Sequence, residues 1–298
     1  MTLVTIIIVN FNTYPYLTPC LDSINKEGLA SDKLEVIVVD NASSDNSVVK
    51  LKRKYPKVRL IGNKENAGFS KANNQAVKKA KGDFILFLNP DTIISKGAIN
   101  KVLDFILNHK DAGIATCRVE LPTGEIDDAC HRGFPTPWNA FCQFTGLSGL
   151  FPKSIFLNGY HLGYRDLDIV HEIDSCAGAF MLVRKKDGDK IGWFDEEYFW
   201  YGEDLDFCYR MRKANRKIYY IPAVKIIHFK GVSSGIKAHS QRNSPADRKT
   251  RILATKARFD VMEIFYKKHY QRKYPLWITK LVLLGIKIKK HFSLLRYL

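Results

Sequence analysis

The chain has 298 residues, which is enough for one large domain or two modest ones around a buried core. Hydrophobic residues make up 46% and charged residues 26%, a composition that excludes wholesale disorder, collagen-like repeats and a disulfide-stapled miniprotein. The unusual feature is a formal net charge of +17, from 47 Lys and Arg against 30 Asp and Glu. Such an excess calls for an anionic partner: nucleic acid, an acidic membrane face or a phosphorylated substrate.

Most of the excess charge lies in the last 58 residues. Residues 241–298 contain 15 Lys and Arg but 3 Asp and Glu, a net of +12, which leaves +5 for residues 1–240. The six cysteines form no C-x-x-C pair and no zinc spacing, which is typical of reduced cysteines in a cytosolic protein. The N-terminal residues have no basic segment or cleavage site and are interpreted as a strand. No window reaches the roughly 18 apolar residues of a spanning helix.

Strands and helices alternate over the first 110 residues or so. Buried strands are predicted at 3–10, 34–40, 58–62 and 83–88. Helices are predicted at 15–26, in a short segment ending at 54, and at 69–81 and 96–108. This alternation predicts a doubly wound, mostly parallel α/β sheet, in which ligands bind at the carboxyl ends of the strands. A further buried strand is predicted over 173–184 and a helix from 203.

Polar residues follow three of the predicted strands, in the segments 10–12, 40–41 and 89–91. Each alone is more typical of a turn than of a ligand site, but together they fall at one edge of the sheet. No G-x-G-x-x-G follows the first strand and no G-x-x-x-x-G-K-[ST] occurs, so dinucleotide and P-loop sites are disfavoured. A nucleotide bound here would have its phosphates bridged by a divalent cation on a carboxylate, for which Asp91 is the candidate.

Six segments occur in a recognisable order: VTIIIVNFN, VIVVDNASSDNS, NKENAGFSKANNQAVKKAKGDFILFLNPD, CAGAFMLVRK, GWFDEEYFWYGEDLDFCYRMRKA and IHFKGVSS. Together they resemble family-2 inverting glycosyltransferases, most closely the bacterial rhamnosyltransferase-like branch, over about residues 3–235. The resemblance implies a GT-A-type fold, a nucleotide-diphosphate sugar donor and a Mg²⁺ or Mn²⁺ ion. It also implies a catalytic domain at 1–240, with a nucleotide-binding half at about 1–120 and an acceptor-binding half at about 121–240.

The resemblance implies where the donor binds. Asp40 stands where the family has a carboxylate that hydrogen-bonds the pyrimidine base, and Asn10 and Asn12 belong to the neighbouring loop. The loop that approaches the nucleotide and sugar is represented by Asn66, Gly68 and Asn73. A glycine at 68 would permit close backbone approach, and it is equally compatible with a tight turn before a helix.

The metal site is implied by the segment 89–91 and a late histidine. Asn89 and Asp91 stand where the family carries its D-x-D motif, and this chain departs from the motif by having Asn first. Asp91 is then the main anionic ligand. His228 resembles the histidine that completes the metal site in some members, although a surface or core histidine after a strand is the alternative.

The acceptor side is expected in the second half of the chain. Asp204 resembles the catalytic base of the family's E-D motif, although acids at a helix N-terminus also complement the helix dipole. Asp206 and Arg210, four residues apart, are predicted to pair. Residues 129–170 are interpreted as a loop region over the acceptor. The remaining acceptor-side candidates, whose aromatic members suit a core equally well, are Gly178, Ala179, Phe199, Trp200 and Glu203.

The basic tail is predicted to be helical over 246–270 and again from 276 to 298, with Pro275 between. Its basic residues flank an apolar stripe, which favours an interfacial helix on an anionic membrane face. The alternative is packing on the domain or on a partner subunit in a homo-oligomer.

The leading hypothesis is an inverting, metal-dependent transferase that moves L-rhamnose from dTDP-rhamnose to a lipid-linked or polysaccharide acceptor during cell-surface polysaccharide assembly. It would work in the cytoplasm, peripherally at the membrane. A UDP-galactose or UDP-glucose donor is the alternative within this class. Outside it stand a nucleic-acid-binding protein and a non-catalytic nucleotide-sugar-binding protein. No nucleic acid is expected as a partner, because the charge is segregated with aliphatic residues and no nucleic-acid module occurs.

Overall fold

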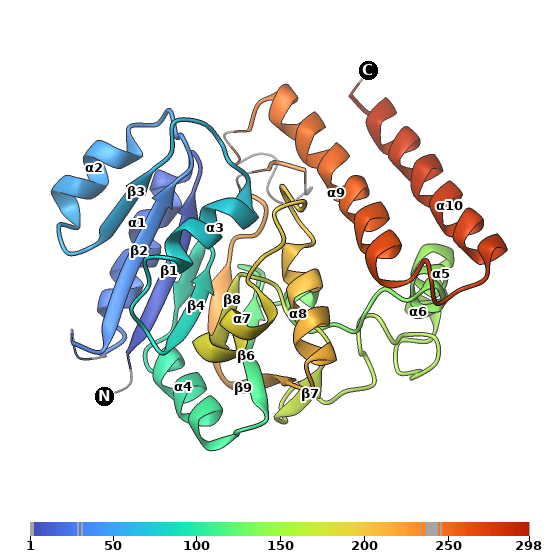
Figure 1. The fold of residues 1–298 in the computed structure, drawn as a ribbon, viewed down its shortest axis with the longest axis horizontal. Helices are drawn as coiled ribbons and strands as arrows, with labels where there is room; N and C mark the ends of the chain where they lie inside the picture. Colours follow the sequence, from blue (N-terminus) through green and yellow to red (C-terminus); the bar gives the residue numbers. More distant parts are fainter. Residues whose placement is uncertain are drawn as a thin grey trace.

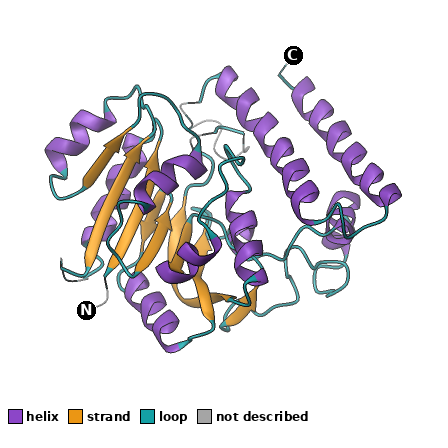
Figure 2. Ribbon diagram, viewed as in Figure 1, coloured by secondary structure: helices purple, strands orange, loops and turns teal. Residues whose placement is uncertain are grey.

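The computed structural model describes residues 3–28, 30, 32–232, 234–236, 244 and 246–297. Within these residues the centre of the molecule is a nine-stranded sheet with helices on both faces (Figures 1 and 2). Its order is β3-β2-β1-β4-β8-β6-β9-β5, and β7 pairs with β9 off this path. The strands are β1 (Val4–Asn10), β2 (Leu34–Asp40), β3 (Arg59–Gly62), β4 (Phe84–Leu88), β5 (Thr92–Ile94), β6 (Ala112–Glu120), β7 (His171–Ile173), β8 (Phe180–Arg184) and β9 (Lys217–His228).

The helices agree with the sequence prediction in the first 110 residues, and three short helices that it did not contain follow. They are α1 (Tyr14–Asn25), α2 (Ser47–Lys54), α3 (Phe69–Val77), α4 (Ala98–Asn108), α5 (Pro137–Thr145), α6 (Leu147–Leu150), α7 (Lys185–Ile191), α8 (Glu203–Lys213), α9 (Arg248–His269) and α10 (Leu276–Leu295), with a 3₁₀ turn η1 at Asp128–Cys130. The helices that the sequence analysis missed are α7 and, in the region expected to be loop, α5 and α6. The exposed aromatic residues of α5 and α6 mask the helical period that the sequence would otherwise show.

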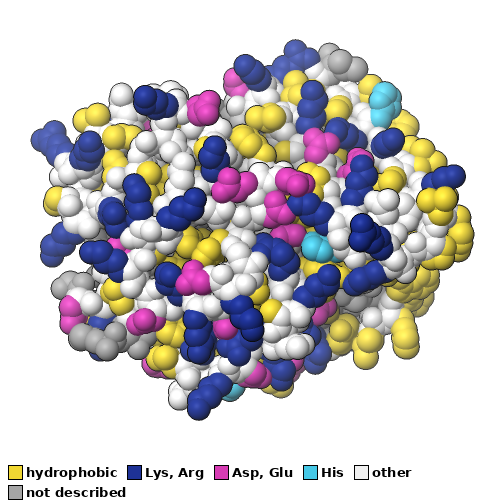
Figure 3. Space-filling model, in the orientation of Figure 1, with side chains coloured by type: hydrophobic (Ala, Val, Ile, Leu, Met, Phe, Trp, Pro, Cys, Tyr) yellow, Lys and Arg dark blue, Asp and Glu magenta, His cyan; other side chains and the backbone are white. Residues whose placement is uncertain are grey.

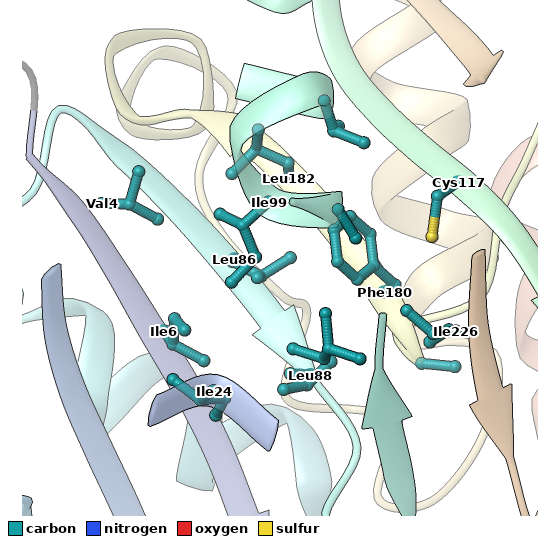
Figure 4. Close-up of a cluster of buried hydrophobic side chains, with 14 of the residues drawn as sticks. Val4, Ile6, Ile24, Leu86, Leu88, Ile99, Cys117, Phe180, Leu182 and Ile226 are labelled. Carbon is teal, nitrogen blue, oxygen red and sulfur yellow. The ribbon is translucent and has the colours of Figure 1, made fainter. Parts of the chain in front are cut away.

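The parallel half of the sheet follows from its apolar strand sequences. β1 pairs in parallel with β2 and β4, and every residue of β1 is buried. Alternate side chains serve the two faces, as strand geometry requires. Val4, Ile6 and Ile8 join the core cluster that includes residues of α1 and α4, shown in Figure 4, whereas Ile7 and Val9 join the one that includes α3 and α8.

The predicted strand over 173–184 is wrong, because the chain forms two strands there. β7 ends at Ile173 and lies antiparallel to β9, while β8 lies antiparallel to both β4 and β6. Between them Ser175 exchanges backbone hydrogen bonds with Arg132, N to O at 3.2 and 3.0 Å. This pairing diverts the chain, so the small residues 177–179 lie between the strands rather than inside one.

The predicted helices of the basic segment are confirmed as α9 and α10, separated by Pro275. α9 packs on α8 through a third apolar cluster that includes Tyr198, Leu205 and Phe265. A buried ion pair of 2.7 Å between His269 Nε2 and an oxygen of Asp206 reinforces this contact. None of the helices in the described residues is long and apolar enough to cross a membrane. The six cysteines are all free, as predicted, and the structure shows in addition that all of them are buried.

Candidate active site

A cavity of about 1070 Å³ lies at the carboxyl ends of β1 and β4 and extends to α9 and α10. Its inner wall combines the end of β4, the end of β9 and the start of α8, which are remote in sequence. The predicted site residues that line it are Asn66, Gly68, Asn89, Asp91, Gly178, Phe199, Trp200, Glu203, Asp204 and His228. The sheet therefore brings most of the candidates to one place, as the rule for strand ends predicts.

Asp40, Asn10 and Asn12 form a hydrogen-bonded turn beside the cavity and are not among its lining residues. One Asp40 oxygen accepts from Asn10 Nδ2 at 2.7 Å and the other from the Ser43 backbone N–H at 2.9 Å. Asn12 has a positive φ of 55° and accepts from the Ser44 N–H at 2.7 Å. These residues fix the shape of the β1 and β2 ends, and the structure uses both Asp40 oxygens internally.

The cavity wall next to this turn is built on Asn41. This residue follows the second strand directly, and the sequence analysis did not include it among the donor-binding residues. Its Nδ2 donates to Asn66 Oδ1 at 2.7 Å, and its Oδ1 accepts from the Ala67 N–H at 3.0 Å. Gly68 has φ of +84°, and a Cβ there would lie 2.8 Å from both the ring and the carbonyl oxygen of Phe199. A glycine is therefore required at 68 both by the backbone conformation and by the close approach of Phe199.

Two further predicted site residues do not reach the cavity. Asn73 is buried, and its Nδ2 donates to the Phe69 carbonyl at 2.9 Å within α3. Ala179 is wholly buried in the hydrophobic core at the start of β8. Gly178, one residue earlier, does line the cavity, and the ring of Phe69 lies 3.7 Å from where its Cβ would be.

Asp91 and His228 meet because β5 pairs antiparallel with β9, with Thr92 opposite His228. His228 Nε2 lies 3.4 Å from Asp91 Oδ1 and 3.2 Å from Asn89 Nδ2. Its other ring nitrogen, Nδ1, lies 2.8 Å from Asp127 Oδ2. Burial lowers the pKa of His228, but Asp91 and Asp127 more than offset this and raise it to about 9.

Asp127 is a site residue that the sequence did not identify. It is wholly buried and forms ion pairs with both His228 and Lys230. Burial disfavours its charge, yet these two partners hold the pKa of Asp127 well below its usual range. A carboxylate on one imidazole nitrogen fixes the ring and directs the other nitrogen outward, here toward Asp91.

Asp91 and His228 offer the donor set of a shared metal site. In the described part of the chain no three His, Cys, Asp or Glu side chains are grouped closely enough to hold an ion by themselves. One carboxylate and one imidazole in the cavity wall fit a Mg²⁺- or Mn²⁺-type ion that completes its coordination with substrate phosphate and water. The residues therefore suit an ion that arrives with a diphosphate.

The start of α8 places two acids in the cavity wall, next to an arginine from the loop after η1. Asp204 Oδ2 lies 3.1 Å from Arg132 Nη2, and its Oδ1 accepts from the Leu205 N–H at 2.6 Å. Ser175 Oγ holds Arg132 from the other side, accepting from Nε at 3.1 Å. Arg132, which lies in the region predicted to be loop and was not among the predicted site residues, thus orients Asp204 and balances its charge.

Glu203 differs from its neighbour in having a buried oxygen, Oε2, without a hydrogen-bond partner among the described residues. Burial, followed by the charge of Asp204, raises the pKa of Glu203 to about 8. Burial and the neighbouring charge thus favour the protonated form of Glu203. At neutral pH Glu203 is a neutral group that can donate a hydrogen bond into the cavity.

Comparison with protein families identifies the chain. Residues 5–186 match the family model described as Glycosyl transferase family 2, which is more than half of the chain. The chain belongs to glycosyl transferase family 2. The predicted resemblance and GT-A-type fold are thereby confirmed. Asp204 and His228 lie beyond the matched segment, so their roles in this transferase depend on the geometry described above.

Two relatives of this family-2 transferase are rhamnosyltransferases. The rhamnosyltransferase WbbL of Escherichia coli (strain K12) is 29% identical over 76% of this chain and 83% of its own length. The N-acetylglucosaminyl-diphospho-decaprenol L-rhamnosyltransferase of Mycobacterium tuberculosis is 25% identical over 77% of each chain. Among solved structures, the mannosyltransferase PcManGT from Pyrobaculum calidifontis, in complex with GDP-Man and Mn²⁺, superposes with a TM-score of 0.59 at 16% identity, covering 99% of this chain and 73% of that one.

Proposed function

We propose that this transferase is an inverting, metal-dependent rhamnosyltransferase that moves L-rhamnose from dTDP-rhamnose to a lipid-linked saccharide acceptor in cell-surface polysaccharide assembly. The observation that supports it most is that Asp204 and the Asp91–His228 pair line one cavity. The names of the two relatives support the sugar, and the second name includes a diphospho-decaprenol acceptor.

On the donor side, Asp91 and His228 would hold the ion, with Asp127 fixing the imidazole. The bound ion would neutralise charge on the departing nucleotide diphosphate. Asn41 and Asn66 line the adjoining wall, where the nucleoside would lie, and the turn around Asp40 lies beside this wall.

On the acceptor side, Asp204 acts as the general base. The acceptor hydroxyl oxygen forms the new bond to the anomeric carbon, its proton passes to Asp204, and the bonding electrons leave with the nucleotide diphosphate. Attack opposite the leaving group inverts the configuration, and it requires one carboxylate rather than the two of a double displacement. Glu203 would donate to the acceptor, and Phe199 and Trp200 would contact its sugar faces.

We further infer that the transferase works peripherally at the cytoplasmic membrane face. α10 exposes Trp277, Leu281, Leu284 and Phe292, and interleaves them with lysines. Exposed apolar residues beside basic ones favour an anionic lipid surface.

The test is a donor screen that measures nucleotide diphosphate release with dTDP-rhamnose, UDP-galactose and UDP-glucose, each with Mg²⁺ or Mn²⁺ and a lipid-linked acceptor. Turnover with dTDP-rhamnose that chelation abolishes is the expected result. Turnover with a UDP-hexose and none with dTDP-rhamnose would mean that the donor is the UDP-hexose. Binding of a nucleotide sugar without any transfer would mean that the protein binds nucleotide sugars and is not a transferase.

A further inference from the structure

The outer half of the cavity is apolar and is formed by α5, α9 and α10. The side chains that line it include Trp138, Phe141, Phe144, Phe265, Trp277 and Leu281. Most of them are strongly exposed: Trp277 retains 65% of its accessible surface and Leu281 60%. Figure 3 shows hydrophobic side chains gathered at the edge of the molecule where Figure 1 places α10 and the α5–α6 segment. An open apolar groove therefore continues from the active site to the surface.

Two cations lie along this groove, one on each of the C-terminal helices. Arg258 of α9 and Lys289 of α10 both line the cavity. Lys289 Nζ lies 3.7 Å from the centre of the Phe144 ring on α5. Burial and then the charge of Arg258 lower the pKa of Lys289, which places the two cations within electrostatic reach of each other. Neither has an acidic partner among the residues that the structure describes. Two uncompensated cations facing a cavity suit a multiply charged anion.

The same cavity wall connects these cations with Asp204, the proposed catalytic base. Tyr201 lines the cavity in the segment that leads directly into the two acids. Gly202 connects the same segment to α9, with Val261 3.0 Å from where a Cβ would lie. The cavity wall thus runs from Asp204 past Tyr201 to Arg258 and then into the apolar groove.

We propose that this groove binds a prenyl diphosphate: Arg258 and Lys289 hold the diphosphate, and the groove between α5 and α10 holds the first isoprenoid units. This rests on the proposed function, in which the acceptor sugar reaches Asp204. The order of chemistries along the cavity matches the order along a prenyl-diphosphate-linked sugar. Its hydroxyl lies at the base, its ring against Tyr201, its diphosphate at the cations and its chain in the groove.

The groove would also explain why the two basic helices are packed against the catalytic body. A helix that only attracted anionic lipid would carry its cations outward, as Lys256 and Lys287 do; both are exposed and neither lines the cavity. Arg258 and Lys289 are exposed as well, but they line the cavity, and Lys289 lies over the Phe144 ring. The position of these charges, rather than their number, is what selects the ligand.

The test measures binding of farnesyl diphosphate to the full chain through the quenching of tryptophan fluorescence. Chelator is present throughout, so that the probe cannot bind through an ion at Asp91 and His228. We expect saturable quenching, with much weaker binding of farnesol and of inorganic diphosphate, because each supplies only half of the contacts.

The variants separate a built site from general attraction. The double variant Arg258→Gln with Lys289→Gln should raise the Kd for farnesyl diphosphate about tenfold or more, because the charge-assisted contacts are lost. The matched control, Lys256→Gln with Lys287→Gln, removes the same charge from the same two helices and should change Kd less than about twofold. Leu281→Gln, at an exposed position, should weaken the binding of farnesyl diphosphate and leave the binding of inorganic diphosphate unchanged.

Equal weakening by the two double variants, equally tight binding of inorganic diphosphate, or no saturable quenching would each overturn the proposal. The donor screen is independent of this result. If the probe binds as expected and no donor is turned over, the proposed function fails and the groove stands. If rhamnose transfer proceeds and the double variant leaves both Kd and acceptor KM unchanged, the groove proposal alone fails.

Discussion

Replacing Glu203 by Gln should stabilise the protein in a pH-dependent way. Glu203 is 6% exposed, and its pKa is raised from 4.5 to about 8 by burial and by Asp204. The folded state therefore binds a proton that the unfolded state releases above pH 4.5, so the free energy of unfolding falls as pH rises from about 4.5 to 8. At pH 7 the separation is 2.5 units, and at 1.36 kcal/mol per unit the penalty is on the order of 3 kcal/mol.

Glutamine keeps the shape of the protonated acid and cannot ionise, so Glu203→Gln removes this penalty. We expect the variant to match the wild type near pH 4.5 and to be more stable by about 3 kcal/mol at pH 7. For a chain of this size that corresponds to a rise in Tm of roughly 6–12 °C. The assay is thermal or urea unfolding of both proteins at closely spaced pH values. Glu65→Gln, an exposed site, is the control and should leave the pH dependence unchanged.

Parallel stability curves for the wild type and Glu203→Gln between pH 4.5 and 8 would refute this reasoning. They would mean that the carboxyl is ionised in the folded protein and that its buried oxygen has a partner. Glu203 would then share the negative charge of the acceptor site instead of donating a hydrogen bond there.

Three further changes have defined outcomes. Asp127→Asn weakens the hold on His228 and should reduce Mn²⁺ affinity about 10–100-fold in a titration with donor present; unchanged affinity would contradict its orienting role. Asp206→Asn breaks the ion pair with Arg210 within α8 and the contact with His269 of α9, and it should cost about 3–5 kcal/mol in urea unfolding at pH 7. Burial opposes the charge of Asp206, but its cationic partners lower its pKa below 3.8, so the wild type alone should lose this stabilisation as pH falls through that lowered pKa; identical acid curves would count against it. Gly68→Ala forces a Cβ to 2.8 Å from Phe199 at a positive φ and should cost about 1–3 kcal/mol, a loss that equal Tm values would exclude.

The parts of the fold that could be predicted are those with local causes. The strands β1, β2 and β4 are continuous apolar runs, and their polar ends mark the carboxyl edge of the sheet. The direction of β8 could not be predicted, because a short apolar sequence is equally compatible with a parallel and an antiparallel strand. The helices α9 and α10 were predictable from periodicity, whereas their contribution to the cavity wall depends on contacts that no periodicity contains.

The candidate site likewise contains residues that the sequence could predict and residues that it could not. Asp91, Asp204 and His228 belong to recognisable segments, and the structure brings them to one cavity. Asp127 and Arg132 were missed because each acts through a partner far along the chain. Asp127 is 101 residues from His228, and Arg132 is 72 residues from Asp204. Such positioning residues are defined by tertiary contact, and a single sequence carries no pattern for them.

The central claim is that Asp204 deprotonates the acceptor while the donor is held elsewhere in the cavity, and Asp204→Asn tests it most directly. The measurement pairs the rate of nucleotide diphosphate release in the presence of acceptor with the Kd for the donor. We expect a loss of about 10²–10⁴-fold in kcat with donor Kd unchanged, as for removal of a general base. Retention of kcat within a few-fold, with the variant folded and donor bound, would contradict it.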